Sequence, residues 1–249
     1  MWRHFIECKE NLKLALSFEP KELQNAVVTG YPMYDEFMAT KGDATMWKNP
    51  DRKFKRIIWA PHHTIEGQTG MLQLSTFMLY ADYMLQLAEQ YKDKVQFVFK
   101  PHPVLKSVLY RPSNWGKEKT DAYYRKWEEG ENTACVYGPY AELFMSSDAM
   151  IHDCGSFTIE YLYTQKPCMY LSTYDKMGQS NEVGRRAFNA HYHGYNEEDI
   201  HQFIDNVVLK GIDNMQSERS AFFDEVLLPP NGSSVAENIL NDIKKQLGK

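Results

Sequence analysis

The sequence of 249 residues lacks several features that would place a protein in a class at once. It has no apolar run near the roughly 20 residues that a membrane-spanning helix needs. It begins Met1-Trp2-Arg3-His4, which does not resemble a secretory signal peptide. Its four cysteines are widely spaced and form no CxxC pair: Cys8, Cys135, Cys154 and Cys168. These absences favour a protein of the reducing cytoplasm, with buried thiols rather than a disulfide framework.

Positive charge is also scarce, because 33 acidic residues outnumber 28 lysines and arginines and leave a net charge of −5. Such a chain has no general basic field for nucleic acid, so we expect no nucleic-acid partner. Any phosphate must therefore be bound by local donors. A hydrophobic content of 43% and an aromatic content of 14% are enough for a sizeable core.

Short apolar runs that alternate with helical patterns predict an α/β fold. The predicted strands are 26–29, 56–60, 95–99, 133–137, 149–151 and 168–171. The predicted helices include a long amphipathic one over 72–91 and a tail of helices only, over 197–208, 213–226 and 233–247. Strands rich in Val, Ile and Phe favour a single doubly wound, Rossmann-like parallel sheet with C-terminal helices. We divide the chain into an N-terminal helical or linker segment, 1–25, and a Rossmann-like nucleotide-diphosphate-binding domain, 26–249.

Polar turns follow four of the predicted strands. They are Gly30-Tyr31-Pro32, Pro61-His62-His63-Thr64, Lys100-Pro101-His102-Pro103 and Asp153-Cys154-Gly155-Ser156. In a doubly wound sheet, ligands bind beyond the carboxyl ends of the strands. The four turns therefore predict a binding site at that edge of the sheet.

The last of these turns is the most informative, because a helix is predicted to follow it. The first N–H groups of a helix lack intrahelical acceptors, and the helix dipole adds partial positive charge. Ser156 and Phe157 would then offer N–H groups to a phosphate, and Glu160 would accept hydrogen bonds from a ribose. The alternative is an ordinary turn in which Asp153 caps the helix and Gly155 relieves backbone strain.

His102 lies between two prolines after a predicted strand, where a helix is predicted to begin. An imidazole there can donate to a diphosphate and offset charge that builds on a leaving nucleotide, which makes His102 the candidate catalytic residue. The alternative is a histidine that caps a helix or packs. Lys100, His63, Thr64 and Gly30-Tyr31 are further candidate ligands of the nucleotide diphosphate, with aromatic packing as the alternative for the tyrosine.

Histidines also raise the question of a metal site. His62 and His63 could be joined by His152, or by His191 and His193. The spacing fits no common zinc pattern, and a catalytic zinc needs three convergent ligands. We expect no metal ion and no cofactor.

Five short segments are more specific together than singly. In chain order they are Gly30-Tyr31-Pro32-Met33-Tyr34-Asp35, Ile57-Ile58-Trp59-Ala60-Pro61, Phe99-Lys100-Pro101-His102-Pro103, Ser147 to Ser156 with Glu160-Tyr161, and Lys166-Pro167. In this order they resemble motifs of the CDP-glycerol glycerophosphotransferases, GT-B enzymes that build teichoic-acid-like polymers. The resemblance covers about residues 27–171.

Two segments depart from that family. His62-His63-Thr64 stands where the family has Thr-Trp-Arg, which puts a basic phosphate contact in doubt. Cys154-Gly155 stands where the family has Tyr-Ser, which moves the turn toward the Asp-Ser-Gly-Gly-x-x-Glu turn of UDP-N-acetylglucosamine 2-epimerases. Those enzymes share the GT-B fold and bind UDP at the same edge.

The resemblance implies the C-terminal, donor-binding half of a GT-B fold. The implied activity is transfer of an alditol phosphate, such as glycerol phosphate, from a CDP-linked donor to a hydroxyl of a polymer or lipid-linked acceptor. The alternatives are a nucleotide-sugar glycosyltransferase or 2-epimerase, and a non-catalytic nucleotide-binding or scaffolding half. Only 25 residues precede the first predicted strand, so the acceptor would reach the site through a missing or separate N-terminal domain. The family also implies peripheral association with the inner face of the membrane.

Overall fold

A parallel sheet forms the centre of the computed structural model, which describes residues 2–19, 21, 23–50, 53–65, 74–172 and 180–248. Its strands, in spatial order, are β5 (Thr133–Cys135), β4 (Val95–Phe99), β3 (Lys55–Ala60), β6 (Ala149–His152), β7 (Cys168–Leu171) and β8 (Tyr192–Gly194). Counted along the chain from β3, this is the order 3-2-1-4-5-6 of a doubly wound fold. The strand order reverses between β3 and β6, so the predicted fold class is confirmed.

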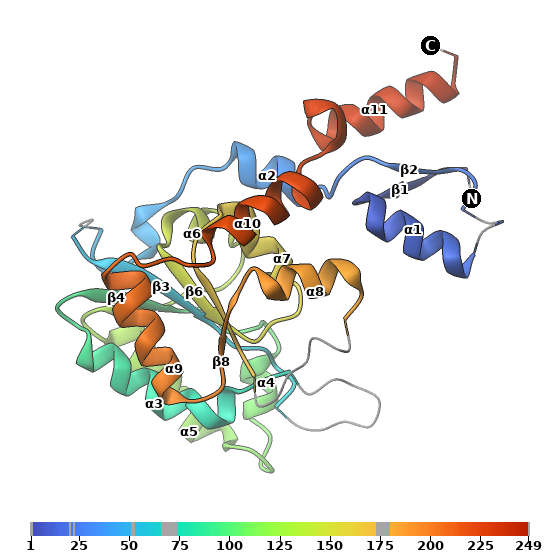
Figure 1. Ribbon diagram of the computed structural model, residues 1–249. Coiled ribbons are helices and arrows are strands. Elements are labelled where there is room, and N and C mark those ends of the chain that lie inside the picture. The colour runs from blue at the N-terminus through green and yellow to red at the C-terminus, as the bar shows by residue number, and fades with distance from the viewer. Residues whose placement is uncertain are drawn as a thin grey trace.

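Helices cover both faces of the sheet (Figure 1). One face carries α3 (Phe77–Gln90), α4 (Leu105–Leu109), α5 (Gly116–Glu129) and α9 (Glu197–Gln202). The other face carries α2 (Met33–Ala39), α6 (Ala141–Ser146), α7 (Phe157–Glu160), α8 (Glu182–Asn189) and α10 (Gln216–Phe222). The two cores alternate along β3, where Ile57 and Trp59 face one core and Ile58 and Ala60 face the other. A strand buried on both faces reads as a continuous apolar run, which is why β3 could be predicted.

Short helical turns extend several of these helices. They are the 3₁₀ turns η1 (Ala44–Met46), η2 (Tyr161–Thr164) and η6 (Pro230–Gly232), and the π-helical segments η4 (Phe203–Leu209) and η5 (Phe223–Leu227). The turn η2 continues α7, so that helical backbone runs from Phe157 to Thr164. No helix in the described part of the chain is long and apolar enough to cross a membrane.

A smaller unit contains both chain ends and stands beside the main sheet (Figure 1). It consists of β1 (His4–Ile6), α1 (Lys9–Phe18), β2 (Ala26–Val28) and α11 (Val235–Gln246). The strands β1 and β2 form a separate parallel pair. Arg3 binds α11 through two hydrogen bonds to the carboxylate of Asp242, at 2.7 and 2.5 Å.

Three expectations about the fold need correction. The strand over 26–29 was expected in the main sheet, but β2 pairs with β1 instead, and its residues are only half-buried. The main sheet gains β8 in its place, a short edge strand that the sequence pattern did not predict. The helix over 72–91 begins at Phe77, and Leu72 lies outside the described residues. The division at residue 25 stays a prediction, and the pairing of β1 with β2 crosses it.

Candidate active site

The carboxyl ends of β3, β4, β5 and β6 surround a cleft of about 400 Å³. The cleft lies where the strand order reverses, which is where ligands of doubly wound folds bind. It is lined by His62, Leu74, Lys100, Pro101, His102, Pro103, Gly138, Tyr140, Cys154, Gly155, Ser156 and Phe157. Five predicted site residues are thus brought together here, namely Lys100, His102, Gly155, Ser156 and Phe157.

Lys100 places a buried positive charge at the cleft. Its side chain is only 5% exposed, and Nζ donates to the carbonyl oxygen of Gly138 at 3.1 Å. Among the described residues, no carboxylate lies within ion-pair distance of Nζ. Burial lowers the pKa of Lys100. A buried cation is costly unless it is paired, so the cleft is suited to an anion.

His102 adds a neutral hydrogen-bond donor next to this charge. Its Nδ1 accepts a hydrogen bond from the backbone N–H of Val104 at 3.2 Å. Because a neutral imidazole has one donor and one acceptor nitrogen, the ring proton lies on Nε2. Burial lowers the pKa of His102, with smaller contributions from His63 and Lys100.

The turn after β3 presents His62 to the cleft, whereas His63 and Thr64 do not line it. The Thr64 hydroxyl bonds Nδ1 of His62 at 2.9 Å and accepts from the N–H of Leu74 at 3.0 Å. Burial lowers the pKa of His63. The prediction that His63 and Thr64 contact the ligand stays a prediction, and His62, which was not among the predicted ligands, is the histidine of the pair that lines the cleft.

Asp153 holds the turns around the cleft together. Its carboxylate is 1% exposed, with Oδ1 accepting from the N–H of His62 at 2.5 Å and Oδ2 accepting from the N–H and hydroxyl of Thr76 at 2.5 and 2.9 Å. The alternative in which Asp153 caps the following helix is therefore wrong. The N-cap of α7 is Ser156, and its side chain makes no capping bond.

The turn before α7 has ordinary backbone geometry. Gly155 is not among the residues with positive φ, and within the described part of the chain an added Cβ would meet only Leu74 Cδ1, at 3.8 Å. The expectation that Gly155 relieves strain is therefore wrong. Cys154 is buried, and its Sγ bonds the carbonyl oxygen of Ala60 at 3.2 Å. Burial raises the pKa of this thiol well above its usual value, so it serves in packing.

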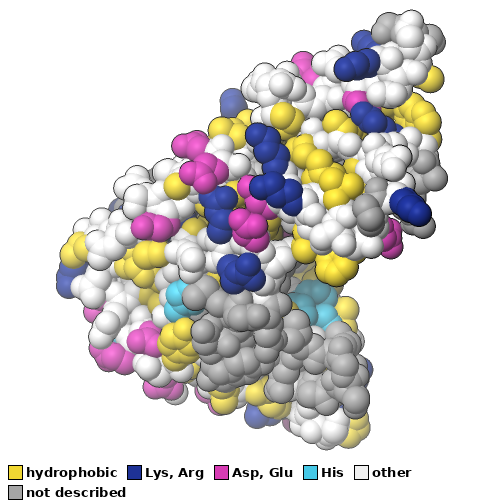
Figure 2. Space-filling view, turned by 45° about the vertical axis from the view of Figure 1, so that its right-hand side comes forward, with side chains coloured by type: hydrophobic (Ala, Val, Ile, Leu, Met, Phe, Trp, Pro, Cys, Tyr) yellow, Lys and Arg dark blue, Asp and Glu magenta, His cyan; other side chains and the backbone are white. Residues whose placement is uncertain are grey.

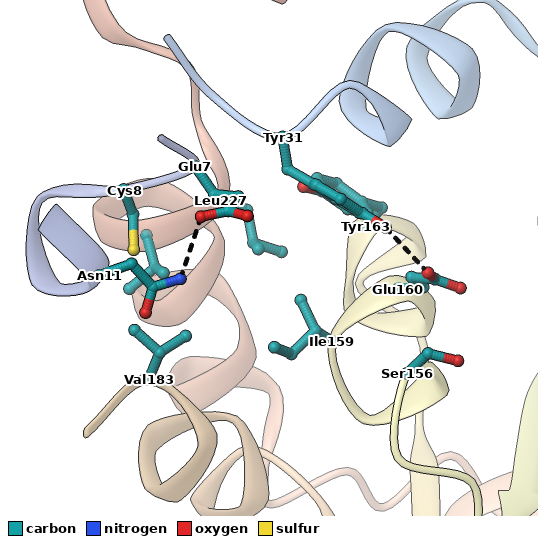
Figure 3. Close-up of a pocket in the computed structure, with 11 residues that line it drawn as sticks. Glu7, Cys8, Asn11, Tyr31, Ser156, Ile159, Glu160, Tyr163, Val183 and Leu227 are labelled. Atoms are coloured by element: carbon teal, nitrogen blue, oxygen red, sulfur yellow. Dashed lines mark hydrogen bonds between the residues drawn. The ribbon is translucent and has the colours of Figure 1, made fainter. Parts of the chain in front are cut away.

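A second cavity of about 180 Å³ adjoins the cleft, and Ser156 borders both. Figure 3 shows Glu7, Cys8 and Asn11 on one side of this cavity and the helix that carries Ile159 and Glu160 on the other. The Glu160 carboxylate is held by two phenols, because Oε1 accepts from Tyr31 at 3.2 Å and Oε2 accepts from the Tyr140 hydroxyl at 2.7 Å. Glu160 therefore lies between the two cavities in a fixed position.

Gly30 lies away from both cavities and supports α11. It has φ +101°, and an added Cβ would lie 2.8 Å from Val235 Cγ2. Asp35, five residues later, accepts hydrogen bonds from the N–H groups of Val235 and Ala236 at 2.8 and 2.9 Å. Ser234 adds a capping box with Glu237. The Gly-Tyr-Pro-x-x-Asp segment therefore fixes the start of α11.

Among the residues that the structure describes, two groups of side chains have the proximity that a metal ion would need. His62 and His63 lie beside His102, and His152 lies beside Cys168 and His191. The sequence suggested that His62 and His63 could be joined by His152, or by His191 and His193, and neither combination is found in these groups. The expectation of no metal ion stays a prediction.

The chain matches a family model over residues 15–243, described as CDP-glycerol:poly(glycerophosphate) glycerophosphotransferase. The chain belongs to this family, as its motifs predicted. None of the curated proteins matches the chain.

Solved structures with a similar fold include the wall teichoic acid polymerase TagF, with a TM-score of 0.62 and 19% identity over 99% of this chain and 59% of TagF. Two others bind UDP or a UDP-sugar. S. aureus MnaA, solved with UDP, has a TM-score of 0.58 and 16% identity over 99% of this chain and 61% of its own. The UDP-GlcNAc 2-epimerase from Neisseria meningitidis, bound to UDP-GlcNAc, has a TM-score of 0.59 and 13% identity over 100% and 61%. These identities show the fold alone, and the chain spans about three fifths of each structure.

Proposed function

We propose that this member of the glycerophosphotransferase family binds the diphosphate of a CDP-linked donor in the cleft beside Lys100. The enzyme would transfer an alditol phosphate, such as glycerol phosphate, to a hydroxyl of a polymer or lipid-linked acceptor. The observation that carries the proposal is the buried Lys100 ammonium, which has no carboxylate partner among the described residues. A diphosphate would supply the missing negative charge, and charge-assisted hydrogen bonds to phosphate are strong.

The reaction would join the acceptor oxygen to the distal phosphorus and break the bond from that phosphorus to the bridging oxygen. The departing CMP then carries new negative charge. Lys100 and the Nε2–H of His102 would offset that charge, together with the N–H groups of Ser156 and Phe157 at the start of α7. The proton of the acceptor hydroxyl would pass to a base on the acceptor side. In this proposal His102 is the catalytic residue of the chain.

The remaining predicted ligands take supporting places. Glu160 would accept hydrogen bonds from the ribose hydroxyls, because each carboxylate oxygen can accept more than the one bond that it receives from tyrosine. Asp153, Thr64 and His63 would position the turn that carries the phosphate donors.

The acceptor-side partner would pack against the small unit that contains both chain ends. The pair of β1 and β2 leaves sheet edges that can extend into a larger sheet. Large apolar side chains of this unit are exposed, with Trp2 at 56%, Phe18 at 77% and Leu247 at 59%. Figure 2 shows apolar side chains gathered beside a narrowing of the molecular outline, where histidines reach the surface. Exposed apolar surface of this kind marks interaction sites.

Thermal-shift titration of the full chain with CDP, UDP and CDP-glycerol tests the proposal. A ligand at 100 times its dissociation constant adds about 2.7 kcal/mol to the free energy of unfolding. We expect a larger shift with CDP than with UDP, and a loss of that shift in His102→Ala. His193→Ala is the matched control, because His193 lies on β8, away from the cleft.

The other outcomes separate the alternatives. A preference for UDP would favour a nucleotide-sugar enzyme, and no nucleotide binding would favour a non-catalytic role. A CDP shift that survives in His102→Ala would remove His102 from the site.

A further inference from the structure

Three imidazole rings pack together beside the cleft, and two of them line it. The ring centroid of His63 lies 4.2 Å from that of His62 and 4.1 Å from that of His102. The rings of His62 and His102 are 4.9 Å apart, and both line the cleft. Such a group can serve a metal ion or an anion, and the position of the ring protons decides between them.

Backbone donors fix those protons in two of the rings. Nδ1 of His62 accepts from the N–H of Thr64 at 3.3 Å and contacts the Thr64 hydroxyl at 2.9 Å. Nδ1 of His102 accepts from the N–H of Val104 at 3.2 Å. A neutral imidazole whose Nδ1 accepts a hydrogen bond carries its proton on Nε2. Each ring therefore carries an Nε2–H group on the side opposite the Nδ1 atom that contacts the backbone.

The hydrogen bonds of these two rings are the reverse of those of a histidine that binds a metal ion. A histidine that binds a metal donates its other ring N–H to a carbonyl or carboxylate, which leaves a lone pair for the metal. His191, outside the cleft, has that arrangement, because its Nδ1 bonds the carbonyl oxygen of Ala187 at 2.7 Å. His62 and His102 have backbone N–H donors at Nδ1 instead. Two ring N–H groups beside the Lys100 ammonium are suited to oxygen atoms that carry negative charge.

We propose that His62 is a second donor to the phosphoryl oxygens and acts as a pair with His102. This inference rests on the proposed function, and it names a residue that the sequence analysis did not place at the ligand. The pair would bind neighbouring oxygens of the diphosphate through their Nε2–H groups. Asp153 holds the backbone N–H of His62 at 2.5 Å, and it thereby fixes the turn that carries the ring.

Binding of inorganic diphosphate to the full chain, measured by titration calorimetry, tests the pair without a nucleoside. We expect His62→Ala to weaken binding about tenfold, the size of one hydrogen bond to a charged oxygen. His62→Gln should keep most of the affinity, because a glutamine amide reaches the place of Nε2. His62→Asn should be as weak as His62→Ala, because its amide ends near the place of Nδ1. Far-UV circular dichroism checks that each variant folds.

Two further measurements distinguish an anion site from a metal site, and the first uses the unmodified chain alone. Nitrogen-15 NMR should show His62 and His102 as the Nε2–H tautomers, and a proton on Nδ1 of His62 would overturn the inference. Titration with Zn²⁺ against a chromophoric chelator should show no tight site that is lost in His62→Ala. Tight zinc binding that depends on His62 would overturn the inference and indicate a metal site instead.

The failure of this inference differs from the failure of the proposed function. Equal affinity of the unmodified chain and His62→Ala for inorganic diphosphate would overturn the role of His62, even if CDP binds. Diphosphate binding could instead depend on His62 in a chain that does not prefer CDP. That result would support the His62–His102 pair and contradict the proposal of a CDP-linked donor.

Discussion

The Tyr140 hydroxyl donates a 2.7 Å hydrogen bond to Oε2 of Glu160, and this bond joins the wall of the cleft to the smaller cavity beside it. Tyr31 holds the other carboxylate oxygen at 3.2 Å. Because Glu160 is only 6% exposed, the two phenols fix the direction in which its remaining lone pairs point. A ribose bound next to the diphosphate would meet a carboxylate that is already in place.

Tyr140→Phe should therefore weaken the binding of CDP and leave the binding of inorganic diphosphate unchanged. The phenylalanine ring keeps its packing against Phe144 and Phe157, whose centroids lie 4.9 and 5.2 Å away. Loss of one hydrogen bond to a carboxylate is expected to cost about fivefold to tenfold in the affinity for CDP. Calorimetry with both ligands makes the comparison. An equal loss for both would place Tyr140 at the phosphate and leave Glu160 without a role in ribose binding.

Lys100→Met should have opposite effects on stability and on binding. Methionine keeps the length of the side chain and removes a buried charge that has no carboxylate partner among the described residues. We expect the free energy of unfolding without ligand to stay the same or to rise by about 1 kcal/mol. The affinity for inorganic diphosphate should fall at least about tenfold. Urea unfolding and calorimetry measure the two effects.

Lys166→Met is the matched control for that variant. Nζ of Lys166 bonds the carbonyl oxygens of Phe144 and Met145 at 3.1 and 2.7 Å, at the C-terminal end of α6. Its replacement should lower the stability and leave diphosphate binding intact. A Lys100→Met variant that behaves like Lys166→Met would show that Lys100 has a structural role only.

The position of the cleft could be predicted from the sequence, because it depends on where buried strands end. Lys100, His102 and Ser156 each follow a run of apolar residues, and the ends of parallel strands meet at one edge. The orientation of single side chains could not be predicted. Whether His62 or His63 faces the cleft depends on the bond from Asp153 to the turn, and these residues are 91 positions apart in the chain.

The short strands β1 and β8 could not be predicted from the sequence pattern, for a different reason. Tyr192–Gly194 contains a glycine and no β-branched residue, so it lacks the composition that marks a strand. It is held by its pairing with β7, a contact that only the tertiary structure supplies. The same holds for His4–Ile6, which is defined by its pairing with β2.

Asp153→Asn tests whether this residue holds the turns at His62 and Thr76 in place rather than contacting the ligand. An asparagine keeps one acceptor oxygen, so the N–H of His62 or the two donors of Thr76 would lose their partner. A buried donor without a partner costs about 1–3 kcal/mol, and we expect a loss of stability in that range. Diphosphate affinity should fall with it, because the turn at His62 is released. Stability that stays unchanged in urea unfolding would contradict this view.

Stability should also depend on pH through two buried histidines. Burial lowers the pKa of His191 to about 3 and the pKa of His152 well below its usual value. His193 and Arg219 add to the lowering at His191, and His191 adds to it at His152. The unfolded chain binds these protons below a pH of about 6.5, where the folded chain does not. Their contribution is therefore complete above that pH, and it is lost as the pH falls toward the folded pKa values.

Urea unfolding between pH 7.5 and 5.5 measures this effect before most carboxylates are protonated. The free energy of unfolding should fall by up to about 1.4 kcal/mol per pH unit for each histidine. His191→Gln should reduce the slope. The same slope in that variant would assign the pH dependence to other groups.

Gly30→Ala and Gly116→Ala should differ in cost, although both glycines have positive φ. Gly30 has φ +101°, and its added Cβ would lie 2.8 Å from Val235 Cγ2 and 3.0 Å from Pro229 Cβ. Gly116 has φ +70°, and none of the described residues has an atom within 4 Å of the added Cβ. Alanine at Gly116 should cost only the backbone strain, about 1 kcal/mol. Alanine at Gly30 should cost about 1–3 kcal/mol more, because the first residue of α11 must move.

Hydrogen exchange distinguishes this cost from a general loss of stability. The N–H groups of Val235 and Ala236 bond Asp35, so they should exchange faster in Gly30→Ala and not in Gly116→Ala. Diphosphate binding should be the same in both variants, because neither glycine lines the cleft. A selective loss of binding in Gly30→Ala would contradict this expectation, and it would show that the cleft depends on the position of α11.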